Sequence, residues 1–143
     1  AKEGEGILGN YSKSNPLDEN VSAIEADQNG YIRMINGGKI LKDAIREMVE
    51  SARLLKENLG WNRADVYIPH QANGRIIEGV ARRISEEGSI VYRNIERYGN
   101  MSAATCAVAL DEALETRVIK PGHKVILTGF GAGFVTAATA IQF

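Results

Sequence analysis

The sequence has little of what several protein classes need. It holds one cysteine in 143 residues, so no internal disulfide can form, and a reducing, cytoplasmic setting is expected. It has no apolar run of the roughly 20 residues that a membrane-spanning helix needs. The formal net charge is -1, which gives no general affinity for nucleic acid. One cysteine and two histidines, His70 and His123, do not make a metal-ligand cluster.

What is present is an ordinary globular composition. Apolar residues make up 44% of the chain and charged residues 24%, enough for one domain with a core. Helical spacing of apolar residues predicts amphipathic helices over 39–59 and 76–84, and a helix rich in small residues follows at about 101–115. Short apolar runs predict strands at 31–35, 66–68, 90–92, 125–127 and 135–141. For residues 1–30 only a strand remnant and a loop are expected.

The predicted elements alternate in type along the chain. Strands and helices in turn are typical of an α/β layered domain. The last two strands are joined by a loop that is too short for a crossover helix, so we expect them to be antiparallel.

Two polar residues stand where such domains collect their sites. His70 follows a buried strand, and Asn100 precedes a helix. An imidazole N–H and a carboxamide N–H can donate to one oxygen and stabilise negative charge that develops there. A simpler interpretation remains open for each: a structural histidine, and an asparagine that caps a helix.

Three further features have both a functional and a structural interpretation. The glycine-rich stretch 129–133 is not a phosphate-binding loop, because no Gly-Lys-Ser/Thr follows, and not a dinucleotide fingerprint, because a predicted strand rather than a helix follows it. It offers backbone N–H groups or simply a tight turn. Arg75, Arg82 and Arg83 fall on one helix face, which is either a docking face or a solvated one. Cys106 lies among small apolar residues and is interpreted as a buried structural thiol.

Three motifs in order resemble the ketoacyl synthase III family of type II fatty acid synthesis. They are Pro-His-Gln-Ala-Asn at 69–73, Tyr-Gly-Asn-x-Ser-Ala-Ala at 98–104 and Gly-Phe-Gly-Ala-Gly-Phe at 129–134. The resemblance extends from Tyr31 to Phe143 and implies a thiolase fold with two similar halves. Residues 1–143 would then be one domain, the carboxy-terminal half, with a mixed five-stranded sheet and flanking helices. The family's nucleophilic cysteine belongs to the other half.

The resemblance also implies roles for single residues. In the family, the cysteine is acylated by an acyl-CoA, and malonyl-acyl carrier protein then loses carbon dioxide and attacks the acyl group. His70 and Asn100 match the pair that stabilises the malonyl thioester enolate. The matches around the glycine-rich loop are Phe130 beside the active site, Ala132 with its oxyanion-hole N–H, and the loop residues Gly131 and Gly133.

Further matches concern binding rather than chemistry. Asn36 and Asn73 fall in the substrate channel that takes the phosphopantetheine arm. Arg75 matches an arginine that docks the acidic carrier protein, and Arg82 and Arg83 extend its face. The implied partners are the carrier protein, acyl-CoA, the other half and a second copy in a homodimer. No cofactor, metal, nucleic acid or membrane is implied.

Two departures from the family pattern affect the choice of substrate. Leu41 replaces a channel phenylalanine, and the loop continues as Phe-Val-Thr-Ala at 134–137 instead of Phe-Thr-Trp-Gly. Two alternatives therefore stay open: a related synthase of polyketide or other secondary-metabolite pathways, and a non-catalytic module that binds a carrier protein or serves assembly.

Overall fold

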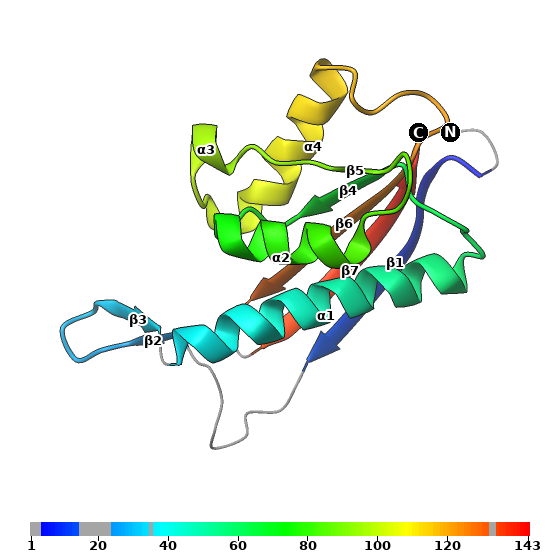
Figure 1. Cartoon of the computed structure of the whole chain (residues 1–143). Helices are drawn as coiled ribbons and strands as arrows, with labels where there is room; N and C mark the ends of the chain where they lie inside the picture. Colours follow the sequence, from blue (N-terminus) through cyan, green and yellow to red (C-terminus); the bar gives the residue numbers. More distant parts are fainter. Residues whose placement is uncertain (1–3, 15–23, 35, 132–133) are drawn as a thin grey trace.

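The computed structural model describes residues 4–14, 24–34, 36–131 and 134–143 (Figure 1). Four α-helices are present in these residues: α1 (Gly37–Asn58), α2 (Gly74–Ile84), α3 (Ile95–Tyr98) and α4 (Thr105–Glu115), the last preceded by a 3₁₀ turn at Ser102–Ala104. The strands are β1 (Gly6–Ser14), β2 (Ile24–Ala26), β3 (Ile32–Met34), β4 (Val66–Pro69), β5 (Ile90–Val91), β6 (Lys124–Gly131) and β7 (Val135–Gln142).

Five of the strands form one mixed sheet in the order β1-β7-β6-β4-β5. Strand β4 is parallel to both β5 and β6, whereas β7 is antiparallel to β6 and to β1. The prediction of an α/β fold with a mixed five-stranded sheet is confirmed, as is the antiparallel pairing of the last two strands. The parallel strands β4 and β6 end side by side, and this edge carries the residues discussed below.

The composition of that sheet corrects one expectation. The predicted strand at 31–35 corresponds to β3, which pairs only with β2 in a separate two-stranded sheet. Its place is taken by β1, for which the sequence had indicated only a strand remnant. Strand β1 gains its regular partner from β7, and this long-range pairing leaves only a weak trace in the local pattern.

Helices cover both faces of the five-stranded sheet (Figure 1). Side chains alternate between the faces, so Tyr67 and Ile126 pack with α1 and α2 while Val66 and Ile68 pack with α4. All four residues of β4 are buried, as expected of a central parallel strand. The edge of the sheet that carries the site is therefore the end of a strand that packs into both core clusters.

Helices α1 and α2 are packed closely at Gly79. A Cβ atom at this position would lie 2.3 Å from Cδ1 of Ile45 on α1. Deeper in the same layer, Ser51 of α1 and Thr128 of β6 are hydrogen-bonded through their hydroxyl groups at 3.0 Å. These contacts fix α1 and α2 relative to each other and α1 to β6.

Candidate active site

The carboxyl ends of β4 and β6 bring His70 next to the glycine-rich segment. The backbone N–H of His70 donates to the carbonyl of Thr128 at 2.7 Å and so extends the ladder by one residue. The ends of neighbouring parallel strands are where α/β proteins usually place their ligands. His70 is therefore fixed by the sheet itself.

The ring of His70 has a defined set of neighbours. Its Nδ1 atom is hydrogen-bonded to the hydroxyl of Thr105, the first residue of α4. The ring of Phe130 meets it edge to face, with 5.6 Å between ring centroids. Burial lowers the pKa of His70 below its ordinary value, because the charged imidazolium loses solvation. Neutral imidazole is thus favoured, and Nε2 is the ring nitrogen left for a ligand.

Asn100 lies in the turn between α3 and α4. Gly99 before it has φ 66° and ψ -161°, a region that is essentially restricted to glycine. The Oδ1 atom of Asn100 accepts a hydrogen bond from the backbone N–H of Ser102 at 2.9 Å. No residue described in the structure accepts from its Nδ2 group, which is exposed and can donate to a ligand.

One cavity joins these two side chains. It has a volume of about 410 Å³ and is lined by both His70 and Asn100, with Asn73 and Phe130 also in its wall. The structure thus brings the two predicted donors to a common space, although their roles in catalysis stay predictions. We refer to this space as the Asn100 cavity.

A second cavity is also lined by His70. Its volume is about 340 Å³, and Cys106 and Val135 belong to its lining. His70, Ser102, Phe130 and Gly131 line both cavities. We refer to this second space as the Cys106 cavity.

Cys106 has the properties of a protonated thiol. Burial raises its pKa, which outweighs the opposing hydrogen bond with Thr105. Its Sγ atom lies 4.0 Å from the carbonyl oxygen of Ile68 and 3.9 Å from that of Thr128, and a thiol can donate weakly to either. These properties agree with the interpretation of Cys106 as a structural residue.

The remaining predicted site residues differ in where the structure places them. Asn73 caps α2 by accepting from the backbone N–H of Arg75 at 2.8 Å. Asn36 begins α1 in a left-handed conformation and is not among the described residues that line the Asn100 cavity, whereas Gly37 next to it is. Ala132 and Gly133 lie outside the described residues. Phe130 stacks on Phe134, with 5.9 Å between ring centroids.

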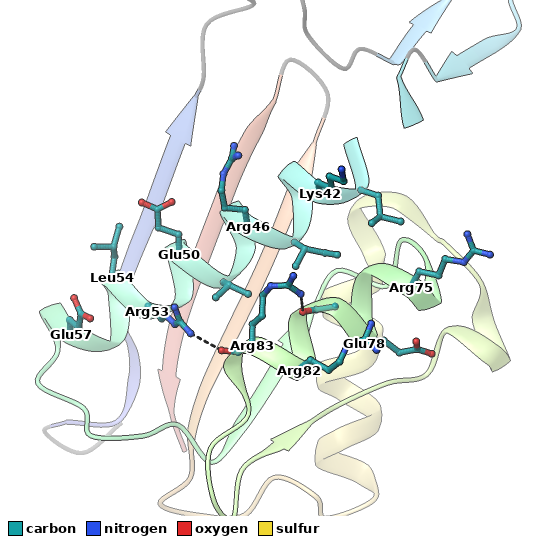
Figure 2. A pocket seen from close by; sticks show the side chains of 14 residues that line it. Lys42, Arg46, Glu50, Arg53, Leu54, Glu57, Arg75, Glu78, Arg82 and Arg83 are labelled. Atoms are coloured by element: carbon teal, nitrogen blue, oxygen red, sulfur yellow. Dashed lines mark hydrogen bonds between the residues drawn. The ribbon is translucent and has the colours of Figure 1, made fainter. Parts of the chain in front are cut away.

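The three predicted docking arginines line a groove between α1 and α2, with a volume of about 950 Å³ (Figure 2). All three are exposed. Arg83 donates to the carbonyl of Gly79 at 2.8 Å and accepts through its own carbonyl from Arg53 of α1 at 2.7 Å. The basic residues of the groove are Lys42, Arg46, Arg53, Arg75, Arg82 and Arg83, and its acidic residues are Glu50, Glu57 and Glu78. The groove therefore carries an excess of positive charge.

Sequence reasoning missed several of these residues. Thr105 was not singled out as the partner of His70, and α1 was not recognised as a source of half the basic groove. The sequence does contain a signal for Thr105, because it follows directly on the 98–104 motif. For the arginines of α1 the sequence offers none, since only the packing of α1 on α2 places them there.

Two kinds of feature are absent from the residues that the structure describes. No group of three or more histidine, cysteine, aspartate or glutamate side chains among them could hold a metal ion. None of their helices combines the length and the apolar character needed to cross a membrane.

A mixed sheet between helical layers, with a histidine at a strand end and an asparagine from a helix-preceding turn at one cavity, defines a thiolase-like half-domain. Residues 54–143 match the family model of the 3-oxoacyl-[acyl-carrier-protein] synthase III C-terminal region. The chain therefore belongs to the 3-oxoacyl-(acyl carrier protein) synthase III family and corresponds to its carboxy-terminal half.

Individual relatives agree with this assignment. A beta-ketoacyl-[acyl-carrier-protein] synthase III of Clostridioides difficile is 43% identical over 109 residues, which are 75% of this chain and 33% of the relative. That of Clostridium tetani is 41% identical over 133 residues, 91% of this chain and 40% of the relative. The crystal structure of the Aquifex aeolicus synthase III superposes with a TM-score of 0.87 at 33% identity, over 100% of this chain and 46% of that one. The chain thus spans less than half the length of these relatives.

Proposed function

We propose that this chain supplies the malonyl-activating half of a condensing enzyme that joins an acyl-CoA primer to malonyl-acyl carrier protein. The observation that carries the proposal is the meeting of His70 and Asn100 at one cavity. Each has one side-chain nitrogen that donates a hydrogen bond to no described residue. The relatives from Clostridioides difficile and Clostridium tetani, both named synthase III, favour this activity over the secondary-metabolite and non-catalytic alternatives.

In the proposed chemistry, the two N–H donors bind the same oxygen of the substrate. The thioester carbonyl of the malonyl group receives hydrogen bonds from Nε2 of His70 and Nδ2 of Asn100. When the bond between the malonyl carboxylate and its α-carbon breaks, carbon dioxide leaves and the electron pair passes into an enolate. Donors held in place stabilise this developing oxyanion without reorganisation. The α-carbon then attacks the acyl thioester, and the thiolate of the cysteine in the other half leaves.

The hydrogen bond with Thr105 matters for this role. A neutral imidazole can donate through Nε2 only when Nδ1 is the acceptor. If the Thr105 hydroxyl donates to Nδ1, the ring is held in the required tautomer. The low pKa that burial gives His70 keeps the ring neutral at physiological pH.

The test is to combine the chain with the amino-terminal half of the Aquifex aeolicus synthase III. Acylation by acetyl-CoA and release of carbon dioxide from malonyl-carrier protein are measured separately. We expect His70→Ala and Asn100→Ala each to slow decarboxylation by roughly 10² to 10³ while acylation changes little, as removal of one oxyanion donor does. Equal loss of both steps, or of neither, contradicts the proposal. The chain by itself is expected to show no condensation.

The proposal extends to binding partners and setting. The groove between α1 and α2 is the surface we assign to the acidic carrier protein, because positive side chains line it beside the Asn100 cavity. A homodimer of the complete enzyme and a cytoplasmic setting are implied by the family resemblance. Sedimentation of the combined halves tests the second copy directly.

A further inference from the structure

The segment that carries Asn100 is tied at both ends to one pair of neighbouring residues. It leaves β5 at Tyr92 and enters α4 at Thr105. At its start, Gln71 accepts through Oε1 from the backbone N–H of Asn94 at 3.0 Å. At its end, Thr105 is hydrogen-bonded to His70. The loop that presents Asn100 is therefore closed onto the strand end that presents His70.

The side chain of Gln71 joins two backbone segments in the interior. It is fully buried and directly follows His70. Its Nε2 group donates to the carbonyl of Pro69 at 2.7 Å and to that of Tyr92 at 3.3 Å. Both ends of the carboxamide are thus satisfied by backbone groups, which leaves the side chain no alternative orientation of similar energy.

Helix α3, between the two ties, has little apolar anchoring, because its half-buried Ile95 belongs to neither core cluster. It is four residues long and none of them is buried. One turn of helix is too short to be stable alone, because its nucleation is unfavourable. Its position therefore depends largely on the polar contacts that hold it.

Glu112 of α4 supplies those contacts. Its side chain is largely buried, with a residue exposure of 8%. Oε2 accepts from Nδ2 of Asn94 at 2.6 Å, and Oε1 accepts from the guanidinium of Arg97. Asn94 and Arg97 stand at the two ends of α3, so a single carboxylate spans the helix. A buried carboxylate held by two donors has a narrow choice of geometry.

We propose that Gln71, Asn94 and Glu112 are positioning residues that hold the α3 turn, and with it Asn100, opposite His70. The inference rests on the proposed function for the role of Asn100, but the placement of the turn can be measured without it. None of the three lines either of the two cavities beside His70.

The first experiment uses hydrogen exchange in the chain as it is. The amide of Gly99 donates to the carbonyl of Ile95 at 2.8 Å and reports the α3 turn. In Glu112→Gln only one oxygen remains to accept, so either Asn94 or Arg97 loses its acceptor, and we expect exchange at Gly99 to rise at least tenfold. The amide of Ile68 in β4 reports global opening and should change much less. Glu115→Gln, an exposed position on the same helix, is the matched control and should leave Gly99 unchanged.

Unchanged exchange at Gly99, or an equal rise at Gly99 and Ile68, overturns the proposal. Should Glu112→Gln fail to fold, Arg97→Gln removes the same contact from the exposed side and should give a smaller rise at Gly99.

The second experiment uses the combined halves described above. Glu112→Gln should lower kcat for malonyl decarboxylation at least tenfold, with KM for malonyl-carrier protein and the rate of acylation within about twofold. Equal loss of both steps overturns the positioning role. If the unsubstituted halves do not decarboxylate malonyl-carrier protein at all, the proposed function fails, and hydrogen exchange alone decides the placement of α3.

Discussion

Nδ1 of His70 and the hydroxyl of Thr105 are hydrogen-bonded although 35 positions separate the two residues in the sequence. The bond joins the end of β4 to the start of α4, and the turn that carries Asn100 lies between these two elements in the sequence. Thr105 is fully buried, which protects the bond from competing water. The orientation of the imidazole is therefore set by the fold before any substrate binds.

Replacing Thr105 tests this relationship directly. In Thr105→Val the hydroxyl is lost and Nδ1 of His70 has no partner, so we expect the free energy of unfolding to fall by about 1–3 kcal/mol. The ¹⁵N chemical shifts of the His70 ring should show a changed tautomer population. Thr105→Ser keeps a hydroxyl and is the matched control, expected to retain the native shifts. Native ring shifts in the valine variant contradict a role of Thr105 in setting the tautomer.

The lowered pKa of His70 predicts how stability depends on pH. Because burial depresses the pKa in the folded state, the unfolded chain binds the proton more readily, with a pKa near 6.5. The contribution of His70 to stability is therefore present above pH 6.5 and is lost as pH falls through the folded pKa. Urea unfolding at pH 7.5 and 5.5 should show a smaller loss in His70→Gln than in the unsubstituted chain. A ring that titrates at or above pH 6.5 in the folded chain contradicts this.

The local sequence was sufficient to predict the inner part of the fold. Period and length identified α1, α2, β4, β6 and β7, because each buries an apolar stripe or run that one core requires. It was insufficient for β1 and α3. Strand β1 depends on pairing with β7 at the far end of the chain, and α3 is contacted at Asn94 and Arg97 by the carboxylate of Glu112 from the later helix α4. Neither cause is visible in a window of neighbouring residues.

The residues of the candidate site can likewise be separated into those that the sequence predicted and those that it did not. His70 and Asn100 could be proposed from their places at a strand end and a helix start together with the motifs around them. Their sharing of a cavity depends on the register of β4 with β6, in which Pro69 lies opposite Thr128. Gln71 lies within the 69–73 motif and Thr105 follows the 98–104 motif, whereas Glu112 is separated from both donors in sequence, and only the packing of α4 brings its carboxylate to Asn94 and Arg97.

The close packing at Gly79 predicts that a larger residue at this position is destabilising, because the side chain of Ile45 must move. Replacement of Gly79 by alanine would put a methyl group 2.3 Å from Cδ1 of Ile45, which is buried. Overpacking of this kind costs about 1–3 kcal/mol and outweighs the helix propensity that alanine gains. Gly38→Ala on α1 has no atom within 4 Å of the new methyl group and is the control, expected to be neutral or stabilising. Chemical denaturation measures both.

The variant pair Gly79→Ala and Ile45→Val identifies the cause of this loss. Truncation of Ile45 removes the terminal methyl group that meets the new Cβ atom, so the double variant should be more stable than the sum of the two single changes predicts. Strict additivity would mean that the loss at Gly79 has another origin than the contact with Ile45.

Charge reversal at Arg75 tests the groove between α1 and α2 as the docking surface. Arg75 is exposed and lines the groove close to Asn73, whose side chain belongs to the Asn100 cavity. Exposed complementary charges mainly speed the encounter of two proteins. In the combined halves, Arg75→Glu should raise the apparent KM for malonyl-carrier protein while acylation by acetyl-CoA changes little. The effect should shrink with added salt, since screening acts over about 10 Å at 0.1 M ionic strength.

The control for this experiment is Arg117→Glu, which makes the same change in net charge at an exposed residue outside the groove. A docking surface predicts that only the Arg75 variant alters the kinetics with the carrier protein. A non-specific attraction between the basic side chains and an acidic partner predicts equal effects, because both variants change the total charge alike. If neither variant has an effect at low salt, the arginines of α2 form a solvated face and the carrier protein docks elsewhere.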